Sequence, residues 1–516
     1  MKPSDELFKL IKSLTKSEKR FFKLSSALQA GDKNYIKLFD AIEKQKEYDE
    51  DDIKKQFRKD TFIKHLPSEK NHLYKLILKS LRGYYADISA SSQLQEEIKN
   101  IEILFRKALY KECAKTVKKA KKLAYTHEKF YYAFELIHWE KMLLEEEYLA
   151  GNFDRDLDNL VQAEQEVIDK LRNLAEHLIL YSKINYVFRK GGIARDEREL
   201  ELVEEITNHP LIKGKNTALS KRAEAISYYI QGLGATFKND FTKSFEKFSK
   251  VVRIFEENPV FIHDIPKQYI RSLNNLLICY MNKNEFKAFF ELMNKMRALK
   301  NQPAFASTDI QLKIFTSTYN AELIAYDLMV DYEKGIPIAE EIVEKMKLFE
   351  GKLSKEEELL FYYNIAYTYF GAGQTRQALR WLNIILNDTE QNLRQDMYSF
   401  ARLFNLVVHY DLGNYDLLDY TIKSTNRFYV KRKREYGTEY KFETVFLKHM
   451  KKIVKLYDQQ EKKESAFKEM RDELQAVFKD RYEKIALDYF DFMSWINSKM
   501  NGHSFAEARK KKMLVT

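Results

Sequence analysis

The stretch Leu359–Asp388, LLFYYNIAYTYFGAGQTRQALRWLNIILND, predicts two helices joined by a tight turn. Its first part has the i, i+3, i+4, i+7 spacing of one helix face, and the side chains on that face are Tyr362, Ile365, Ala366 and Tyr369. Two glycines, Gly371 and Gly373, then mark the turn. The second part repeats an apolar stripe at i, i+4 and i+7, formed by Ala378, Leu382 and Ile385. Two amphipathic helices of this kind can pack their stripes against each other.

Small residues on both predicted helices, Ala366 and Ala378, allow the two backbones to approach closely. The pattern resembles the tetratricopeptide (TPR) repeat family, and the positions that carry it are Tyr362, Ile365, Ala366, Tyr369, Gly373 and Ala378. The stretch departs from the family at Thr375, Ile385 and Glu390, where an aromatic residue, an alanine and a proline are usual. The resemblance implies a helical unit that stacks on further copies of itself.

Weaker copies of this turn recur along the chain, each with an anchor residue just after the expected break. The anchors are Tyr110, Phe153, Ile193, Phe241, Phe286, Ile336, Thr375 and Tyr415. Their intervals run from 39 to 50 residues with a mean near 44, longer than the roughly 34 residues of an ordinary TPR repeat. We therefore expect an all-α chain, a right-handed α-solenoid of about eight TPR-like helix pairs over 95–430 with helical caps at 1–90 and 431–516.

Composition agrees with a helical array. The 516 residues include 14% aromatic residues but only 15 glycines and 7 prolines, too little turn chemistry for a β-rich protein. Two cysteines, Cys113 and Cys279, provide no disulfide framework, so we expect buried thiols and a cytoplasmic location. The charged N-terminus lacks an apolar core, and we expect neither a signal peptide nor membrane insertion. The bias to Lys, Tyr, Phe, Asn and Ile is typical of low-GC bacteria.

The N-terminal unit, residues 1–90, is basic, with 20 lysines and arginines against 14 acidic residues. Thr15 and Glu18 have the spacing of a capping box, which predicts a helix start near Ser17. The unit is interpreted either as a helical cap for the array or as a nucleic-acid-binding module. At the other end, the pattern predicts long helices near 437–459, 461–480 and 483–500, then a short docking helix in the last residues.

Motifs for catalysis or metal binding are missing from the sequence. Gly214-Lys215 lacks the leading glycine of a phosphate loop, because His209 stands there. No HExxH, CxxC or EF-hand loop occurs. We therefore expect no enzyme activity, no cofactor and no metal.

The TPR resemblance implies that the first helix of each pair lines a concave groove. Carrying the family's groove positions over gives a candidate partner-binding set of Tyr229, Arg271, Asn274, Tyr363, Tyr367, Phe370 and Phe404. Rigid aromatic side chains with a few polar groups suit a bound peptide or helix. The alternative is that many of these aromatic side chains pack between neighbouring repeats.

Basic clusters provide a second set of candidates, which could contact phosphates. The candidate residues are Lys115, Lys118, Lys122, Lys431, Arg432, Lys433 and Arg434. The first three belong to a stripe that also includes Lys107 and Lys111, on one face of a predicted helix. The alternative interpretation of the stripe is an ordinary solvated face.

The function that we expect is that of a scaffold or adaptor that binds another protein or peptide in the solenoid groove. The alternative is a nucleic-acid- or ribosome-associated regulatory factor that uses the basic N-terminal unit and the basic clusters. A third hypothesis is a peptide-sensing regulator with an N-terminal effector domain. The sequence leaves the partner and the oligomeric state open.

Overall fold

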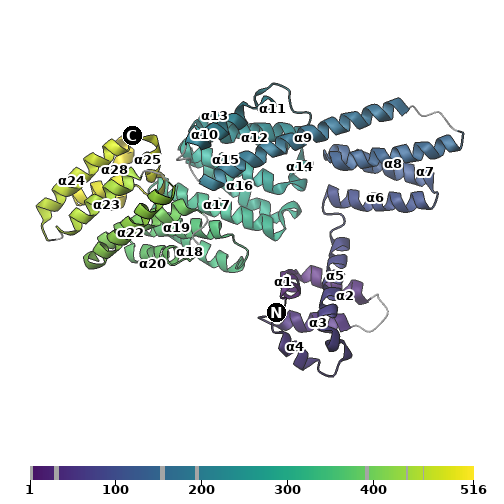
Figure 1. The fold of residues 1–516 in the computed structure, drawn as a ribbon, viewed down its shortest axis with the longest axis horizontal. Coiled ribbons are helices and arrows are strands. Elements are labelled where there is room, and N and C mark those ends of the chain that lie inside the picture. The colour runs from purple at the N-terminus through teal and green to yellow at the C-terminus, as the bar shows by residue number, and fades with distance from the viewer. Residues whose placement is uncertain are drawn as a thin grey trace. The chain divides into compact units, whose positions relative to one another are not determined.

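The computed structural model is helical throughout the residues it describes, which are 4–27, 34–151, 157–191, 197–389, 394–436, 440–456 and 458–515 (Figure 1). These residues contain no strand, which confirms the all-α class. The chain packs as two compact units, 1–171 and 172–516. No helix in the described ranges combines the length and the apolar content needed to cross a bilayer.

The first unit begins with short helices around a small core that includes Phe22, Phe39 and Ile77. Its helices are α1 (Glu6–Ser13), α2 (Lys16–Ala27), α3 (Asn34–Lys44), α4 (Glu50–Gln56), a 3-10 turn (Thr61–His65), α5 (Leu66–Tyr84), α6 (Ala90–Arg106), α7 (Tyr110–Thr126) and α8 (Phe130–Leu149), and α9 (Leu157–Gly191) runs into the second unit. The capping box is confirmed, because the Glu18 amide donates to the Thr15 hydroxyl at 3.3 Å and the Glu18 carboxylate accepts from the Thr15 amide.

The second unit continues with α10 (Glu197–Asn208), α11 (Pro210–Lys213), α12 (Lys221–Phe237), α13 (Phe241–Glu257), α14 (Pro259–Asp264), α15 (Pro266–Asn282), α16 (Phe286–Ala298), α17 (Thr308–Leu328), α18 (Tyr332–Leu348), α19 (Lys355–Gly371), α20 (Thr375–Leu386), α21 (Gln395–Asp411) and α22 (Tyr415–Tyr436). Short 3-10 turns, Leu299–Asn301 and Pro303–Phe305, precede α17. From α15 to α22 each helix packs on the next one, and α15, α17 and α19 also pack in succession on one another (Figure 1).

One turn geometry recurs between successive helices. A residue with a left-handed backbone lies two positions after the last residue of the first helix. The next helix begins two positions after that residue. The amide just after that residue bonds to the carbonyl five positions back, as Gln374 does to Tyr369 at 2.8 Å and Asp331 does to Tyr326 at 2.9 Å. The left-handed residues are Ala108, Glu128, Asn239, Asn284, Val330, Gly373 and Gly413.

Five of the eight predicted anchors, Tyr110, Phe241, Phe286, Thr375 and Tyr415, begin a helix at such a turn and are confirmed. The anchor at Ile336 is wrong, since α18 begins at Tyr332 and Gly335 lies inside that helix. At this turn Val330 is the residue with the left-handed backbone. Because valine rarely adopts that conformation, a search for Gly, Asn or Asp at the turns does not find it. Phe153 and the anchor Ile193 lie outside the described residues.

Prolines begin helices at Pro210, Pro259, Pro266 and Pro303, where no amide hydrogen is required. Pro337 instead lies inside α18. Because proline has no amide hydrogen, the helix lacks the backbone hydrogen bond from that position to the carbonyl four residues earlier.

The C-terminal helices are α23 (Lys441–Val454), α24 (Gln460–Val477), α25 (Arg481–Lys484), α26 (Ala486–Tyr489), α27 (Phe492–Asn501) and α28 (Phe505–Val515). The single helix predicted at 483–500 is wrong, because the chain is extended at Phe490, with φ −153° and ψ 137°. The Asp491 side chain then caps α27 by accepting from the Ser494 amide at 3.0 Å. The predicted terminal docking helix is present as α28.

We predict that Gly371→Ala destabilises the second unit by about 1–3 kcal/mol through overpacking. A Cβ at this position would lie 2.2 Å from the Tyr332 ring, at the contact between α18 and α19. Urea unfolding followed by circular dichroism measures the change. Gly83→Ala is the control, because a Cβ at that helical glycine would lie 4.0 Å from Phe21 and should cause no loss. Equal stability of the two variants would contradict the predicted contact.

Candidate functional site

Four of the predicted groove aromatics meet in one cluster. Tyr363, Tyr367 and Phe370 on α19 place their ring centroids 6.0, 5.9 and 5.3 Å from that of Phe404 on α21. Tyr363, Phe370 and Phe404 are buried, and Tyr367 is half-buried. These four side chains therefore lie together on the facing sides of α19 and α21.

The chain itself covers this aromatic cluster. The ring of Phe490, which follows α26, lies 4.6 Å from Phe404 and 5.4 Å from Tyr367. Phe505 of α28 stacks on Phe490 at 5.2 Å and contacts Phe370 at the same distance. Residues that the TPR resemblance assigns to an external partner thus pack on residues of the C-terminal segment.

Polar contacts fix the start of that segment. The Tyr489 ring stacks on Phe400 at 4.1 Å, and its hydroxyl donates to the Asp396 carboxylate. The Tyr489 carbonyl accepts from the Tyr363 hydroxyl at 3.2 Å. Arg394 binds Asp396 at 2.8 Å. Burial opposes ionisation of Asp396, but the hydrogen bonds and charge of Arg394 outweigh it and lower the pKa of this carboxyl.

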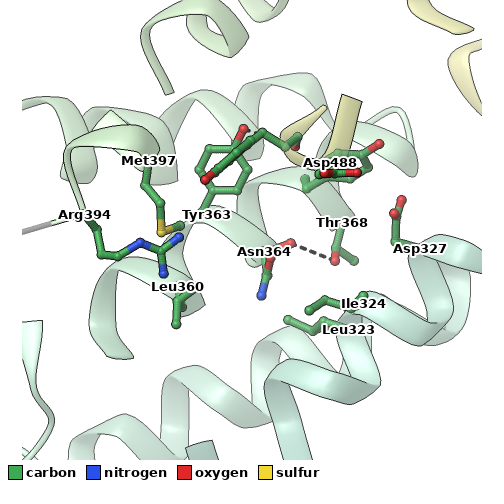
Figure 2. A pocket seen from close by; sticks show the side chains of 12 residues that line it. Leu323, Ile324, Asp327, Leu360, Tyr363, Asn364, Thr368, Arg394, Met397 and Asp488 are labelled. Carbon is green, nitrogen blue, oxygen red and sulfur yellow. Dashed lines mark hydrogen bonds between the residues drawn. The ribbon is translucent and has the colours of Figure 1, made fainter. Parts of the chain in front are cut away.

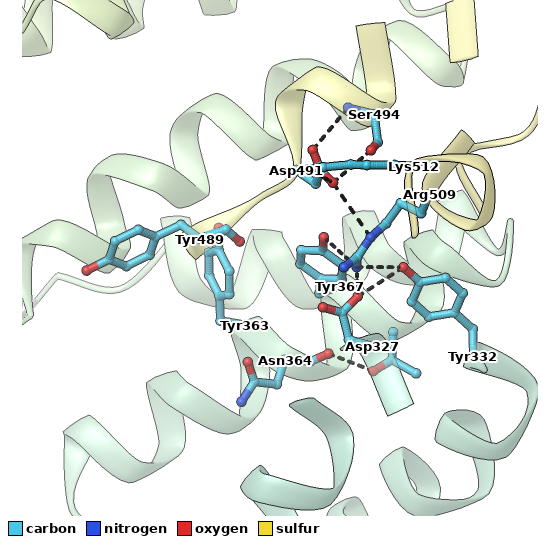
Figure 3. Close-up of polar contacts among 11 residues, drawn as sticks. Asp327, Tyr332, Tyr363, Asn364, Tyr367, Tyr489, Asp491, Ser494, Arg509 and Lys512 are labelled. Atoms are coloured by element: carbon cyan, nitrogen blue, oxygen red, sulfur yellow. Dashed lines mark hydrogen bonds and ion pairs between the residues drawn. The ribbon is translucent and has the colours of Figure 1, made fainter. Parts of the chain in front are cut away.

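A second polar group lies beside Tyr367 (Figure 3). Arg509 of α28 forms an ion pair with Asp327 of α17 and donates to the hydroxyls of Tyr332 at 3.0 Å and Tyr367 at 3.2 Å. Tyr332 in turn donates to Asp327 at 2.9 Å. On the other side, the Arg509 Nε lies 3.8 Å from Asp491. One guanidinium therefore connects α17, α18 and α19 with the C-terminal helices.

A pocket of about 370 Å³ remains open next to these contacts (Figure 2). The lining combines aliphatic, aromatic, amide and charged side chains and consists of Leu323, Ile324, Asp327, Leu360, Tyr363, Asn364, Tyr367, Thr368, Arg394, Met397, Asp488 and Tyr489. Ile324 is 38% exposed, and the Asn364 amide donates to the Asn320 side chain at 3.0 Å. We take this pocket and the aromatic cluster beside it as the candidate site.

The other predicted groove residues lie on α12 and α15, outside this pocket. Tyr229 is buried with its ring 5.2 Å from Tyr181, and Arg271 donates to the Tyr181 hydroxyl at 2.9 Å. Asn274 is half-buried on α15. These three side chains are therefore not part of the cluster on α19 and α21.

The predicted lysine stripe is exposed at every position. Lys111, Lys115, Lys118 and Lys122 lie on α7, whereas Lys107 is the residue after the end of α6, so the prediction of one continuous helix is wrong for that residue. The other lysines of α7 are paired, Lys119 with Glu97 at 3.0 Å and Lys121 with Glu140. The stripe on α7 therefore presents four lysines side by side to solvent.

The cluster Lys431–Arg434 lies inside α22, in the last turns of that helix. Arg432 is half-buried and donates to the Gln395 side chain at 2.8 Å and to the Ser399 hydroxyl at 3.0 Å. Lys431, Lys433 and Arg434 are exposed. Arg432 therefore contributes to packing between α21 and α22.

Several residues of the site escaped the sequence analysis. Asp327, Asp396 and Arg509 carry no local motif, and the contacts that join them to the site cross 182 positions between Asp327 and Arg509 and 93 positions between Asp396 and Tyr489. Tyr489 and Phe490 stand in a stretch whose pattern is that of a continuous helix. The one available signal was the density of aromatic residues near the C-terminus, which exceeds what a solvated terminal helix needs.

Compared with family models, with curated proteins and with solved structures, the chain matches none of them. Across the residues that the structure describes, no group of three or more His, Cys, Asp or Glu side chains is placed to hold a metal ion. The geometry of this chain is therefore the basis for its proposed function.

We predict that Tyr489→Phe destabilises the second unit by about 1.5–3 kcal/mol, the usual loss for a hydrogen bond to a charged group. The pKa of Asp396 lies below its ordinary value of 3.8, so this contribution is complete above that pH and is lost as the pH falls through the lowered pKa. Urea unfolding over a series of pH values, from pH 7 down to the lowest pH at which the chain stays folded, measures it. Tyr420→Phe, at a tyrosine that is 65% exposed, serves as the control. A pH-independent difference would contradict the role of the carboxylate.

Proposed function

We propose that this chain is a non-enzymatic, cytoplasmic scaffold that binds another protein or peptide on the face formed by α17, α19 and α21. The helix pairs form a TPR-like α-solenoid over 95–430, between an N-terminal helical domain at 1–90 and a C-terminal cap at 431–516. Support comes from the recurring turn geometry and from the contacts between successive helices. An array of this kind offers an extended surface for a partner.

The observation that carries the proposal is the pocket beside the aromatic cluster. It brings exposed Ile324 together with Asn364 and with the charged groups of Arg394 and Asp488. Apolar area next to a few polar groups is what a peptide-binding surface provides, since the apolar part supplies affinity and the polar part fixes orientation. Asp488 is exposed at the rim, where it can attract a basic group.

We expect Ile324→Asp to weaken capture of a partner protein at least tenfold, because it places a charge on the apolar part of the pocket. Affinity capture from native lysate with nuclease present, followed by quantitative mass spectrometry, measures the change. The matched control is Ile384→Asp on α20, because that isoleucine is 42% exposed and lies outside the pocket. A partner retained equally by both variants would exclude this pocket as its site.

A second candidate function, association with nucleic acid or the ribosome, is favoured by the lysine stripe on α7. Four exposed lysines on one helix face can displace several counterions from a phosphate backbone, which gives an affinity that falls steeply with salt. The net charge of +11 adds a general attraction to polyanions. The Lys431–Arg434 cluster contributes three exposed cations.

If that function holds, Lys115→Glu, Lys118→Glu and Lys122→Glu together abolish binding of labelled RNA or DNA at low salt. The slope of log affinity against log salt should fall by about 0.9 for each phosphate of duplex DNA that the chain no longer neutralises. The control changes the net charge equally at dispersed exposed positions, Lys462→Glu, Lys468→Glu and Lys479→Glu. Fluorescence anisotropy gives both affinities, and equal loss in the two variants would leave only non-specific attraction.

A further inference from the structure

We propose that α28 is a displaceable occupant of the candidate site, and that the site recognises a helical segment presenting phenylalanine and arginine four residues apart. This inference rests on the proposed binding function and specifies the partner's chemistry. In the chain itself the pair is Phe505 and Arg509, which lie on the same face of α28.

The apolar half of the recognition is a slot for one aromatic ring. Phe505 fits between Phe370, Tyr367 and Phe490, with ring centroids at 5.2, 6.1 and 5.2 Å. Three walls of the slot are thus aromatic. A planar ring fills it better than an aliphatic side chain, since edge and face contacts between rings add to the burial of apolar area.

The polar half of the recognition selects a guanidinium. Its Nη1 pairs with Asp327 and reaches the hydroxyls of Tyr332 and Tyr367, while its Nε faces Asp491 (Figure 3). A guanidinium holds its donors in a rigid plane that points to two sides, which suits two carboxylates on opposite sides better than the compact, flexible ammonium of a lysine. When Arg509 leaves, a largely buried carboxylate loses its cation, so the open site favours another arginine.

The fold holds α28 less firmly than the helices before it. Phe490, Phe492 and Trp495 are fully buried, whereas Phe505 and Ala508 are the only buried residues among 505–514 of α28. Gly502, in the left-handed conformation with φ 64°, separates it from α27. The far end of the helix is exposed, with Leu514 at 87%. Opening of α28 alone therefore requires much less loss of packing than opening of α27.

The open pocket adjoins the place that α28 occupies. Asp327 and Tyr367, which hold Arg509, also line the pocket of about 370 Å³ (Figure 2). Departure of α28 would therefore join the Arg509 site to that pocket and lengthen the surface available to a partner. A segment longer than α28 could use both parts and so compete with it.

The test uses the full-length chain and a fluorescein-labelled peptide with the sequence of residues 502–516. We expect Arg509→Ala, which weakens docking of α28, to bind this peptide at least tenfold more tightly than the wild-type chain, as measured by fluorescence anisotropy. Lys510→Ala, at an exposed neighbour on the same helix, is the control and should bind like wild type. A peptide with Arg509→Ala should lose binding to the Arg509→Ala chain. Equal binding to wild type and the Arg509→Ala chain would overturn the inference.

A second measurement on the wild-type chain applies even if Arg509→Ala fails to fold. Hydrogen exchange should be at least tenfold faster in residues 505–515 than in 492–501, because α28 opens by itself. Exchange of both helices at one common rate would overturn the inference.

The peptide assay needs no cellular partner, so the two proposals can fail separately. If the labelled peptide does not bind, but a partner is captured whose binding is weakened by Ile324→Asp, this inference alone is overturned. If the peptide binds, but no captured partner is weakened by Ile324→Asp, the proposed function alone is overturned.

Discussion

Burial of the Phe490 ring between α19, α21 and α28 is the interaction on which the C-terminal half of the structure depends. A stack of helix pairs leaves the apolar face of its last pairs in contact with water unless something covers it. Phe404 and Phe370 belong to that face, and Phe490 fills the space against them. Each aromatic side chain buried in this way contributes about 1.5–3 kcal/mol, so the C-terminal segment strongly stabilises this end of the second unit.

Apolar burial alone does not determine how the C-terminal segment is oriented on the aromatic cluster, because the hydrophobic effect has no direction. Directional contacts at the edge of the aromatic cluster supply that information. Tyr489 is held by Asp396, Arg509 by Asp327, and Trp495 donates to Asp411 at 3.0 Å, a carboxylate that Lys499 also approaches at 2.8 Å. Since a buried group that lost such a partner would be costly, these contacts select one register for the segment 489–509.

Local pattern was enough to predict much of the fold and part of the site. The spacing of apolar residues is enough to predict that the chain is helical and where most of the turn anchors fall. It also predicts that Tyr363, Tyr367 and Phe370 share one face of a helix. Sequence reasoning failed where tertiary contacts override local preference. Val330 adopts a left-handed backbone that valine disfavours, and Phe490 breaks a helix although phenylalanine is no helix breaker. The occupant of the aromatic face could not be predicted, because Tyr489 lies 126 positions from Tyr363.

The C-terminal segment has two parts, residues 489–501 and α28, which differ in how deeply they are buried. This difference bears on the proposed function. Phe490, Phe492 and Trp495 are fully buried in the main core, so removing them would unfold this end of the second unit. By contrast, α28 adds only the ring of Phe505 to the aromatic part of that core and is otherwise held by the ion pairs of Arg509 and Lys512, beyond a left-handed glycine. Such a division would allow one surface to be covered for stability and still to bind a partner. The deeply buried part stabilises the fold of the second unit, and the weakly held part is the one that we propose a partner displaces.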